Sequence, residues 1–140
     1  MALRDRIILH EGWKNYTYAD EFSNHTWGAG HEDPHSPIGE YHTDAQIGAQ
    51  LDADISATTG ALERNLPWTV SLDPVRLGVF IELAFNMGVG KLLDFQHMLA
   101  AAQAGDWEQA SAQLLDSAYH VQVGQRAVDL ANIMLTGVDQ

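Results

Sequence analysis

The chain has 140 residues, no cysteine and a formal net charge of −12, from 7 Lys and Arg against 19 Asp and Glu. This is the length of one ordinary domain, which can bury a core without disulfides. The acidity argues against functions that neutralise phosphates, so nucleic acids and anionic lipids are poor candidate partners. We expect a single domain over residues 1–140, acting without a cofactor or a metal.

The N-terminal segment lacks the features of a secretory signal. Its apolar run is only Ile7, Ile8 and Leu9, and Glu11 follows soon afterwards. The most apolar stretch, residues 77–87, is interrupted by Glu82 and is too short to span a bilayer. We therefore expect a protein that does not insert into membranes and that can accumulate in a reducing cytoplasm.

The first predicted element is a short helix that carries Glu11. Leu3, Ile7 and Glu11 are spaced at i, i+4 and i+8, and Gly12 suits the end of the helix. A half-desolvated carboxyl at the negative end of a helix dipole is favoured in its protonated form, as a general acid requires. A solvated terminal glutamate is the alternative interpretation of this segment taken alone.

Residues 16–31 predict a β-hairpin or a small three-stranded sheet. On the second strand we expect Thr26, Gly28 and Gly30 to share one face, where exposed backbone would let a ligand approach closely. The two glycines are equally compatible with a twisted, weakly packed edge.

The rest of the chain predicts helices. After a loop over residues 32–42, Thr43 looks like the N-cap of a long helix that joins two lobes. Asp73 and Pro74 begin a nearly all-apolar helix that should lie at the centre of a core. Further amphipathic segments cover residues 95–102, 107–114 and 123–134, the last closed by Gly137. The predicted fold class is α+β, mainly helical.

Several short motifs together resemble the T-even-phage-type lysozymes, glycoside hydrolase family 24. They are His10-Glu11-Gly12, Tyr18-Ala19-Asp20, Thr26-Trp27-Gly28-Ala29-Gly30-His31, Ala84-Phe85-Asn86-Met87-Gly88 and Gln125-Arg126-Ala127. The resemblance covers nearly the whole chain, and the order Glu, eight residues, Asp, five residues, Thr, four residues, His is specific. It implies a lysozyme-like fold with lobes at about residues 1–60 and 61–140.

The resemblance also implies roles for individual residues. Glu11 would protonate the glycosidic oxygen, while Asp20 and Thr26 would hold the attacking water. The expected outcome is inversion, for which the carboxyls should lie about 6.5–9.5 Å apart. His31 and Asp54 would form a structural pair. The residues expected to contact the substrate or orient the catalytic groups are Gly30, Phe85, Asn86, Ser117 and Arg126, with Arg126 paired to Glu11.

The activity implied is hydrolysis of the β-1,4 bond between N-acetylmuramic acid and N-acetylglucosamine in bacterial peptidoglycan. In phage-driven lysis, a monomer would wait in the host cytoplasm for release by a holin-like protein and would then act in the periplasm or cell wall. A lytic transglycosylase-like enzyme and a non-catalytic wall-binding virion protein are the alternatives. Asp20 and Thr26 argue against the first of these, because it needs no water-positioning groups.

One motif suggests a different chemistry. Residues 31–35 spell His-Glu-Asp-Pro-His, which formally matches the H-E-x-x-H pattern of zinc proteases. That site needs both histidines on one helix face, and Pro34 inside the motif opposes a helix. We therefore expect no zinc site.

Overall fold

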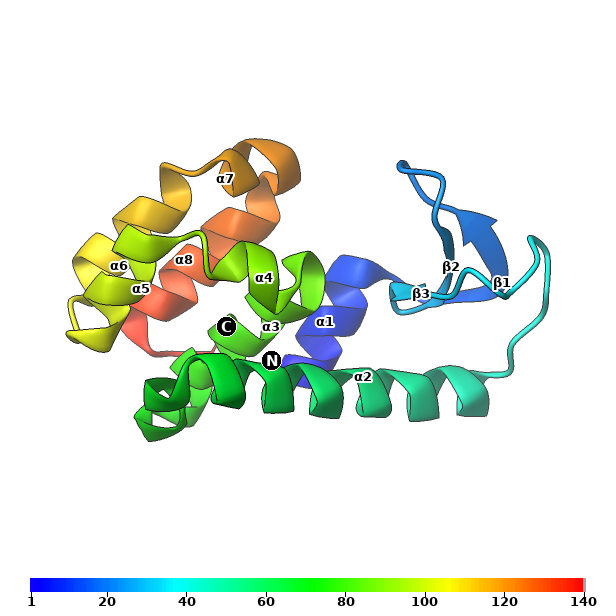
Figure 1. Ribbon diagram of the computed structural model, residues 1–140, viewed down its shortest axis with the longest axis horizontal. Helices are drawn as coiled ribbons and strands as arrows, with labels where there is room; N and C mark the ends of the chain where they lie inside the picture. The colour runs from blue at the N-terminus through cyan, green and yellow to red at the C-terminus, as the bar shows by residue number, and fades with distance from the viewer. Residues whose placement is uncertain (140) are drawn as a thin grey trace. The chain divides into compact units, whose positions relative to one another are not determined.

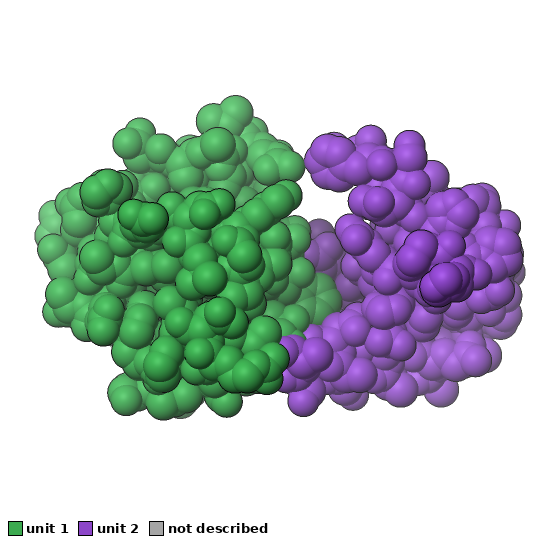
Figure 2. Space-filling view, viewed as in Figure 1, with its two compact units in different colours: residues 1, 58–140 green, residues 2–57 purple. Residues whose placement is uncertain are grey.

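The computed structural model describes residues 1–139, which form a mainly helical α+β fold, as the sequence predicts (Figure 1). The chain forms two compact units (Figure 2). The N-terminal unit is Ala2–Ala57, and the C-terminal unit is Met1 with the chain from Thr58 onward. The division falls within the long helix α2, Asp44–Asn65. No helix in the described part of the chain is both long and apolar enough to cross a membrane.

The N-terminal unit contains helix α1 and a small antiparallel sheet with strand order β1-β2-β3. Its elements are α1 (Leu3–Glu11), β1 (Lys14–Ala19), β2 (His25–Gly28), β3 (His31–Glu32) and the first part of α2. In the sheet, Tyr18 pairs with Thr26, and Thr26 pairs in turn with Glu32. Helix α2 begins with a reciprocal cap in which Thr43 Oγ1 accepts from the Gln46 amide and Gln46 Oε1 accepts from the Thr43 amide.

Two details of the sheet differ from the prediction. The first strand begins at Lys14, two residues before Tyr16. The second strand ends at Gly28, and Gly30 lies in the turn to β3, so it shares no strand face with Thr26. The reason is the backbone: Gly28 and Gly30 have φ angles of +67° and +76°, which are outside the range of a regular strand.

The core of the N-terminal unit combines an apolar cluster with buried polar groups. Ile7, Trp27, Ile47 and Leu51 are buried. The Trp27 ring stacks on the His42 ring with centroids 3.8 Å apart. His42 Nε2 lies 3.0 Å from the Thr17 hydroxyl, and these buried partners hold the loop after β3 against β1.

The C-terminal unit is built around α3, whose N-cap Asp73 accepts from the Arg76 amide, as the sequence predicts. Its elements after α2 are the 3₁₀ helix η1 (Pro67–Ser71), α3 (Pro74–Met87), α4 (Val89–Leu92), α5 (Gln96–Gln103), α6 (Trp107–Leu115), α7 (Ala118–Val123) and α8 (Gln125–Thr136). Helix α6 packs against α5 and α8. Ser111 on α6 donates to the Ala131 carbonyl of α8 at 2.9 Å. Gly137, at φ +69°, ends α8 as predicted.

Candidate active site

Glu11 is the last residue of α1. Gly12 ends the helix with φ +89°, and its amide donates to the Ile8 carbonyl at 2.8 Å. Ile7, one turn earlier, is fully buried and anchors the helix, whereas Glu11 is only partly exposed to solvent. The sequence prediction of a helix that ends at a half-buried Glu11 is therefore confirmed.

Gly30 lies directly against the Glu11 carboxyl. A Cβ atom built on Gly30 would lie 2.7 Å from Oε2 of Glu11 and 3.2 Å from its Cδ. Real side chains essentially never approach so closely, so the missing side chain is what leaves room for the carboxyl. The turn after β2 thus brings two of the predicted site residues together.

Asp20 directly follows β1 and begins the tight turn that leads to Asn24. Its Oδ1 accepts from the backbone amides of Phe22 and Asn24 at 2.9 and 2.8 Å. Its own amide donates to the Asn24 carbonyl at 2.9 Å. These bonds fix the direction of the Asp20 carboxylate by local turn geometry.

Thr26 is linked to the same turn. It is buried on β2, and its hydroxyl donates to the Asn24 carbonyl at 3.0 Å. Asn24 therefore contacts both predicted water-holding residues through its backbone. The sequence does not indicate this role for Asn24, because a turn residue that acts through its main chain leaves no side-chain signal.

Tyr18 is a further residue of this region, and its role is not evident from the sequence. Burial, together with the nearby charges of Glu11 and Asp20, raises the pKa of Tyr18 above its ordinary value of 10.0. Its phenol therefore remains a neutral hydrogen-bonding group close to both carboxylates. No signal in the sequence indicates this role, because Tyr18 comes to lie opposite Thr26 only when the hairpin has formed.

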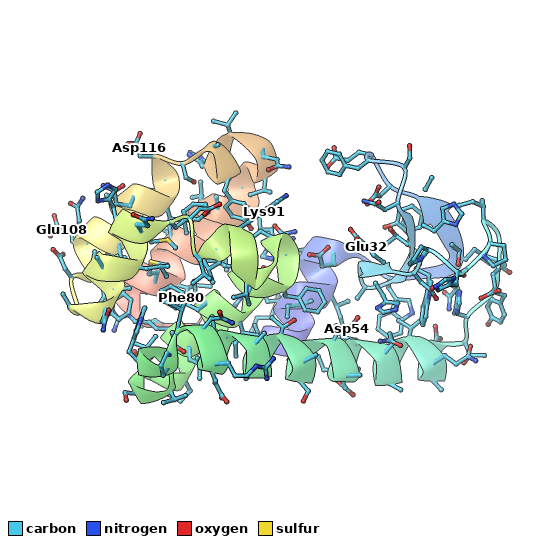
Figure 3. The ribbon with its side chains drawn as sticks, in the orientation of Figure 1. Glu32, Asp54, Phe80, Lys91, Glu108 and Asp116 are labelled. Atoms are coloured by element: carbon cyan, nitrogen blue, oxygen red, sulfur yellow. The ribbon has the colours of Figure 1, made fainter. Side chains whose placement is uncertain are left out.

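His31 and Asp54 also lie together. Asp54 projects from α2 (Figure 3), and its Oδ2 is 2.7 Å from Nδ1 of His31 at the start of β3. The other carboxylate oxygen accepts from the Gln50 side chain at 2.8 Å. The pair joins the sheet to α2 within the N-terminal unit.

The remaining predicted site residues belong to the C-terminal unit. Phe85 and Asn86 lie in the last turn of α3, both partly exposed. Ser117 is the N-cap of α7, where its hydroxyl donates to the Leu114 carbonyl at 2.6 Å. These positions are compatible with substrate contact, which remains a prediction.

Arg126, on α8, has a partner that the sequence analysis did not foresee. Its Nε donates to Oε2 of Glu82 on α3 at 3.0 Å, and the Glu82 side chain is fully buried. The sequence identified Glu82 only as an interruption of an apolar run. The expected pairing of Arg126 with Glu11 remains a prediction.

The residues of the zinc-protease pattern do not form a helix. His31 is in β3 and Pro34 is in a turn. Among residues 1–139, no group of three or more His, Asp, Glu or Cys side chains could hold a metal ion.

Comparisons with known proteins agree with the motifs. The family model described as "Phage lysozyme" matches residues 9–132. Over 161 aligned residues the chain is 27% identical to the pre-baseplate central spike protein Gp5 of Enterobacteria phage T4, covering 98% of this chain but only 28% of that protein. It is 23% identical to a probable T4-type lysozyme 1 of Dictyostelium discoideum, covering 97% of this chain and 95% of that protein. Since the family model matches most of its length, this chain belongs to the phage lysozyme family of glycan-hydrolysing enzymes.

Proposed function

We propose that this domain is a muramidase that cleaves the β-1,4 bond between N-acetylmuramic acid and N-acetylglucosamine in bacterial peptidoglycan, with inversion at the anomeric carbon. Glu11 is the general acid that protonates the leaving oxygen. Asp20 and Thr26 hold the water that attacks the anomeric carbon from the opposite side. Gly30, Phe85, Asn86, Ser117 and Arg126 contact the substrate or orient the acid.

The observation that carries this proposal is the arrangement around Gly30. Gly30, with a positive φ angle, lies where any side chain would collide with Oε2 of Glu11, so the glycine is what allows the carboxyl to take this position. A general acid needs a fixed carboxyl position, because the glycosidic oxygen must come within hydrogen-bonding distance of its proton.

The Asp20 turn supports the second half of the mechanism. Two backbone amides hold Oδ1 of Asp20, and Asn24 links that turn to the Thr26 hydroxyl. A nucleophilic water needs a base and a second acceptor in fixed positions, because loss of orientation is costly in rate. Tyr18, whose pKa is raised by burial and by the charges of Glu11 and Asp20, is a further candidate for contact with the sugar.

Product analysis tests the reaction. Purified peptidoglycan is digested with the protein or with the Glu11→Gln variant, which keeps the shape of the side chain but cannot donate a proton. Mass spectrometry should find reducing muramic-acid ends with the unmodified protein only. Anhydromuramic ends would instead identify a transglycosylase, and an absence of new ends would contradict the hydrolytic function. Proton NMR of the first product anomer then tests inversion.

The comparisons favour a second setting for the same chemistry. Nearly the whole chain matches just over a quarter of a pre-baseplate central spike protein, so the domain could act from a virion as well as from the host cytoplasm. An antibody against the domain distinguishes the two settings. Signal in purified virions supports the spike setting, and signal only in the soluble fraction of infected cells supports an endolysin released by a holin-like protein.

A further inference from the structure

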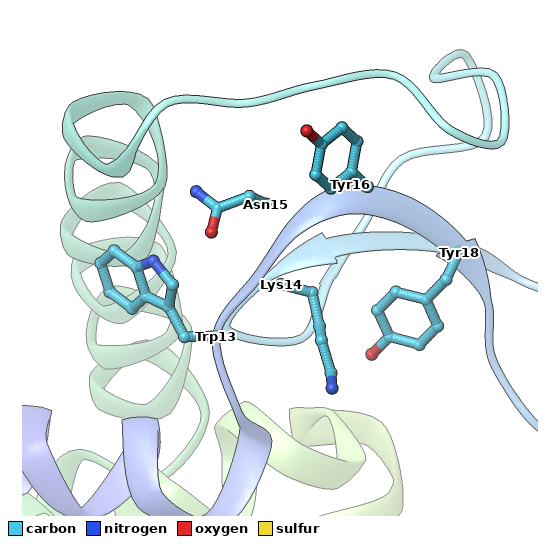
Figure 4. Close-up of a pocket in the computed structure, with 5 residues that line it drawn as sticks. All are labelled: Trp13, Lys14, Asn15, Tyr16 and Tyr18. Carbon is cyan, nitrogen blue, oxygen red and sulfur yellow. The ribbon is translucent and has the colours of Figure 1, made fainter.

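The N-terminal unit has a pocket next to the proposed catalytic residues. It has a volume of about 440 Å³ and is lined by Trp13, Lys14, Asn15, Tyr16 and Tyr18 (Figure 4). Lys14, Asn15, Tyr16 and Tyr18 belong to β1, and Trp13 directly precedes it. The pocket is therefore one continuous feature of this strand, with three aromatic rings in its wall.

Part of the pocket wall is rigidly held. The Trp13 indole and the Asn15 amide both donate to Oδ1 of Asp44 at 2.9 Å, and the Asn15 amide also donates to the His42 carbonyl at 3.0 Å. These bonds attach the start of β1 to the first turn of α2. The wall is thus organised before any ligand arrives.

The pocket borders the catalytic carboxylates through Tyr18. This residue lines the pocket and is also close enough to Glu11 and Asp20 for their charges to raise its pKa. In Figure 4 the side chains of Lys14 and Tyr18 project toward the same side of β1. A glycan strand that contacts Tyr18 would therefore lie on the side of β1 to which Lys14 projects.

Lys14 is the cationic group of this pocket. Its side chain is exposed, and no ion pair to it is found within residues 1–139. The chain has only 7 Lys and Arg. A lysine in an aromatic pocket suits a ligand that has both a pyranose ring and a carboxylate.

We propose that this pocket is a subsite for the acidic substituent of the glycan: the Tyr18 ring contacts a sugar, and the Lys14 ammonium binds a carboxylate carried by the muramic acid. The proposal rests on the proposed muramidase function and adds a specificity-determining residue to it. In intact peptidoglycan the carboxylate belongs to the stem peptide. In glycan stripped by an amidase it is the free lactyl carboxylate of the muramic acid.

The test compares Lys14→Gln with the unmodified protein on intact peptidoglycan and on amidase-stripped glycan. Lys91→Gln, which removes an exposed lysine of α4, is the matched control. A partly exposed ion pair of about 1 kcal/mol corresponds to about a five-fold change, so KM should rise about five-fold with little change in kcat. Lys14→Arg should restore KM, and Lys91→Gln should leave it unchanged.

The two substrates identify the carboxylate. A rise in KM on intact peptidoglycan alone assigns the site to the stem peptide, and a rise on the stripped glycan as well shows that it also accepts the lactyl group. Binding of a neutral N-acetylglucosamine oligomer, followed by NMR, should not change in Lys14→Gln. An unchanged KM on both substrates, or equal weakening of the neutral oligomer, would overturn the subsite proposal. Failure of the unmodified protein to cleave either substrate would instead refute the muramidase function.

Discussion

The Cα of Gly30 faces the carboxyl of Glu11 so closely that a Cβ there would lie 2.7 Å from Oε2. Gly30→Ala should therefore displace the Glu11 carboxyl and reduce glycan cleavage about 100-fold. The backbone at this position has a φ angle of +76°, so the alanine of the variant should also lower folding stability by about 1–2 kcal/mol. Reducing-end release and urea unfolding measure the two effects separately.

Gly39→Ala is the matched control for this prediction. Gly39 has φ +87°, and a Cβ atom there meets nothing within 4 Å. The control variant should show a similar loss of stability with unchanged cleavage. Equal activity losses in the two variants would mean that backbone strain, and not the contact with Glu11, causes the effect.

Asp20 has two separable tasks, one in the turn and one in the reaction. Asp20→Asn keeps an oxygen that can accept from the Phe22 and Asn24 amides, so its stability should stay near that of the unmodified protein. Asp20→Ala has no such oxygen, so its free energy of unfolding should fall by about 1 kcal/mol. Both variants should lose about 100-fold or more in cleavage, because neither supplies a carboxylate base. Activity retained by Asp20→Asn would contradict the water-holding role.

The buried pair of Glu82 and Arg126 predicts strong energetic coupling. Glu82→Leu removes the carboxylate that pairs with the Arg126 guanidinium, while the guanidinium remains buried. This loss should cost about 3–5 kcal/mol of stability. Replacing both residues, as Glu82→Leu with Arg126→Met, should recover much of the loss because no unpaired charge remains. Urea unfolding of the four proteins in this cycle gives the coupling energy. A coupling energy near zero would show that the pair contributes no net stability.

The fold was predictable wherever a local signal existed. The spacing of Leu3, Ile7 and Glu11 located the first helix, and the capping signals at Thr43 and Asp73 located two helix starts. Helices α4 and α7 were missed because four and six residues are too short to show a helical period.

The candidate site was predictable in its residues but less so in its contacts. The alternation of side chains along β2 suggested that Gly30 continues the strand, whereas its positive φ angle, which alternation cannot reveal, places it in a turn. The bond between Glu82 and Arg126 joins positions 44 residues apart, so nothing local in the sequence indicates it. Tyr18 belongs to a motif of the resemblance, but its closeness to two carboxylates depends on how the hairpin folds.

Asp44 should make the stability of the N-terminal unit depend on pH in acid. Hydrogen bonds from the Asn15 amide and the Trp13 indole lower the pKa of Asp44 from its ordinary value of 3.8. Because the folded pKa is the lower one, this stabilisation is present above the unfolded pKa and is lost as pH falls through the folded pKa. Asp44→Asn should therefore flatten the fall in melting temperature below about pH 4. Asp116→Asn, at an exposed position of the C-terminal unit, is the control and should leave that profile unchanged.

The net charge of −12 should govern how the protein approaches a cell wall. Peptidoglycan and its associated polymers are anionic, so the mean interaction is repulsive. That repulsion extends about 30 Å at about 0.01 M salt but only about 10 Å at about 0.1 M. Clearing of outer-membrane-stripped cells should therefore become faster over this range of salt. Cleavage of a short soluble fragment should change much less, because Glu11 and Asp20 act at close range.

Lys14 offers an internal comparison. If its pocket binds a carboxylate, Lys14→Gln loses an attraction that salt weakens in the unmodified protein. Clearing by this variant should therefore increase more steeply with salt. A monotonic fall in clearing with added salt would show that a local cationic patch, and not the net charge, controls the encounter.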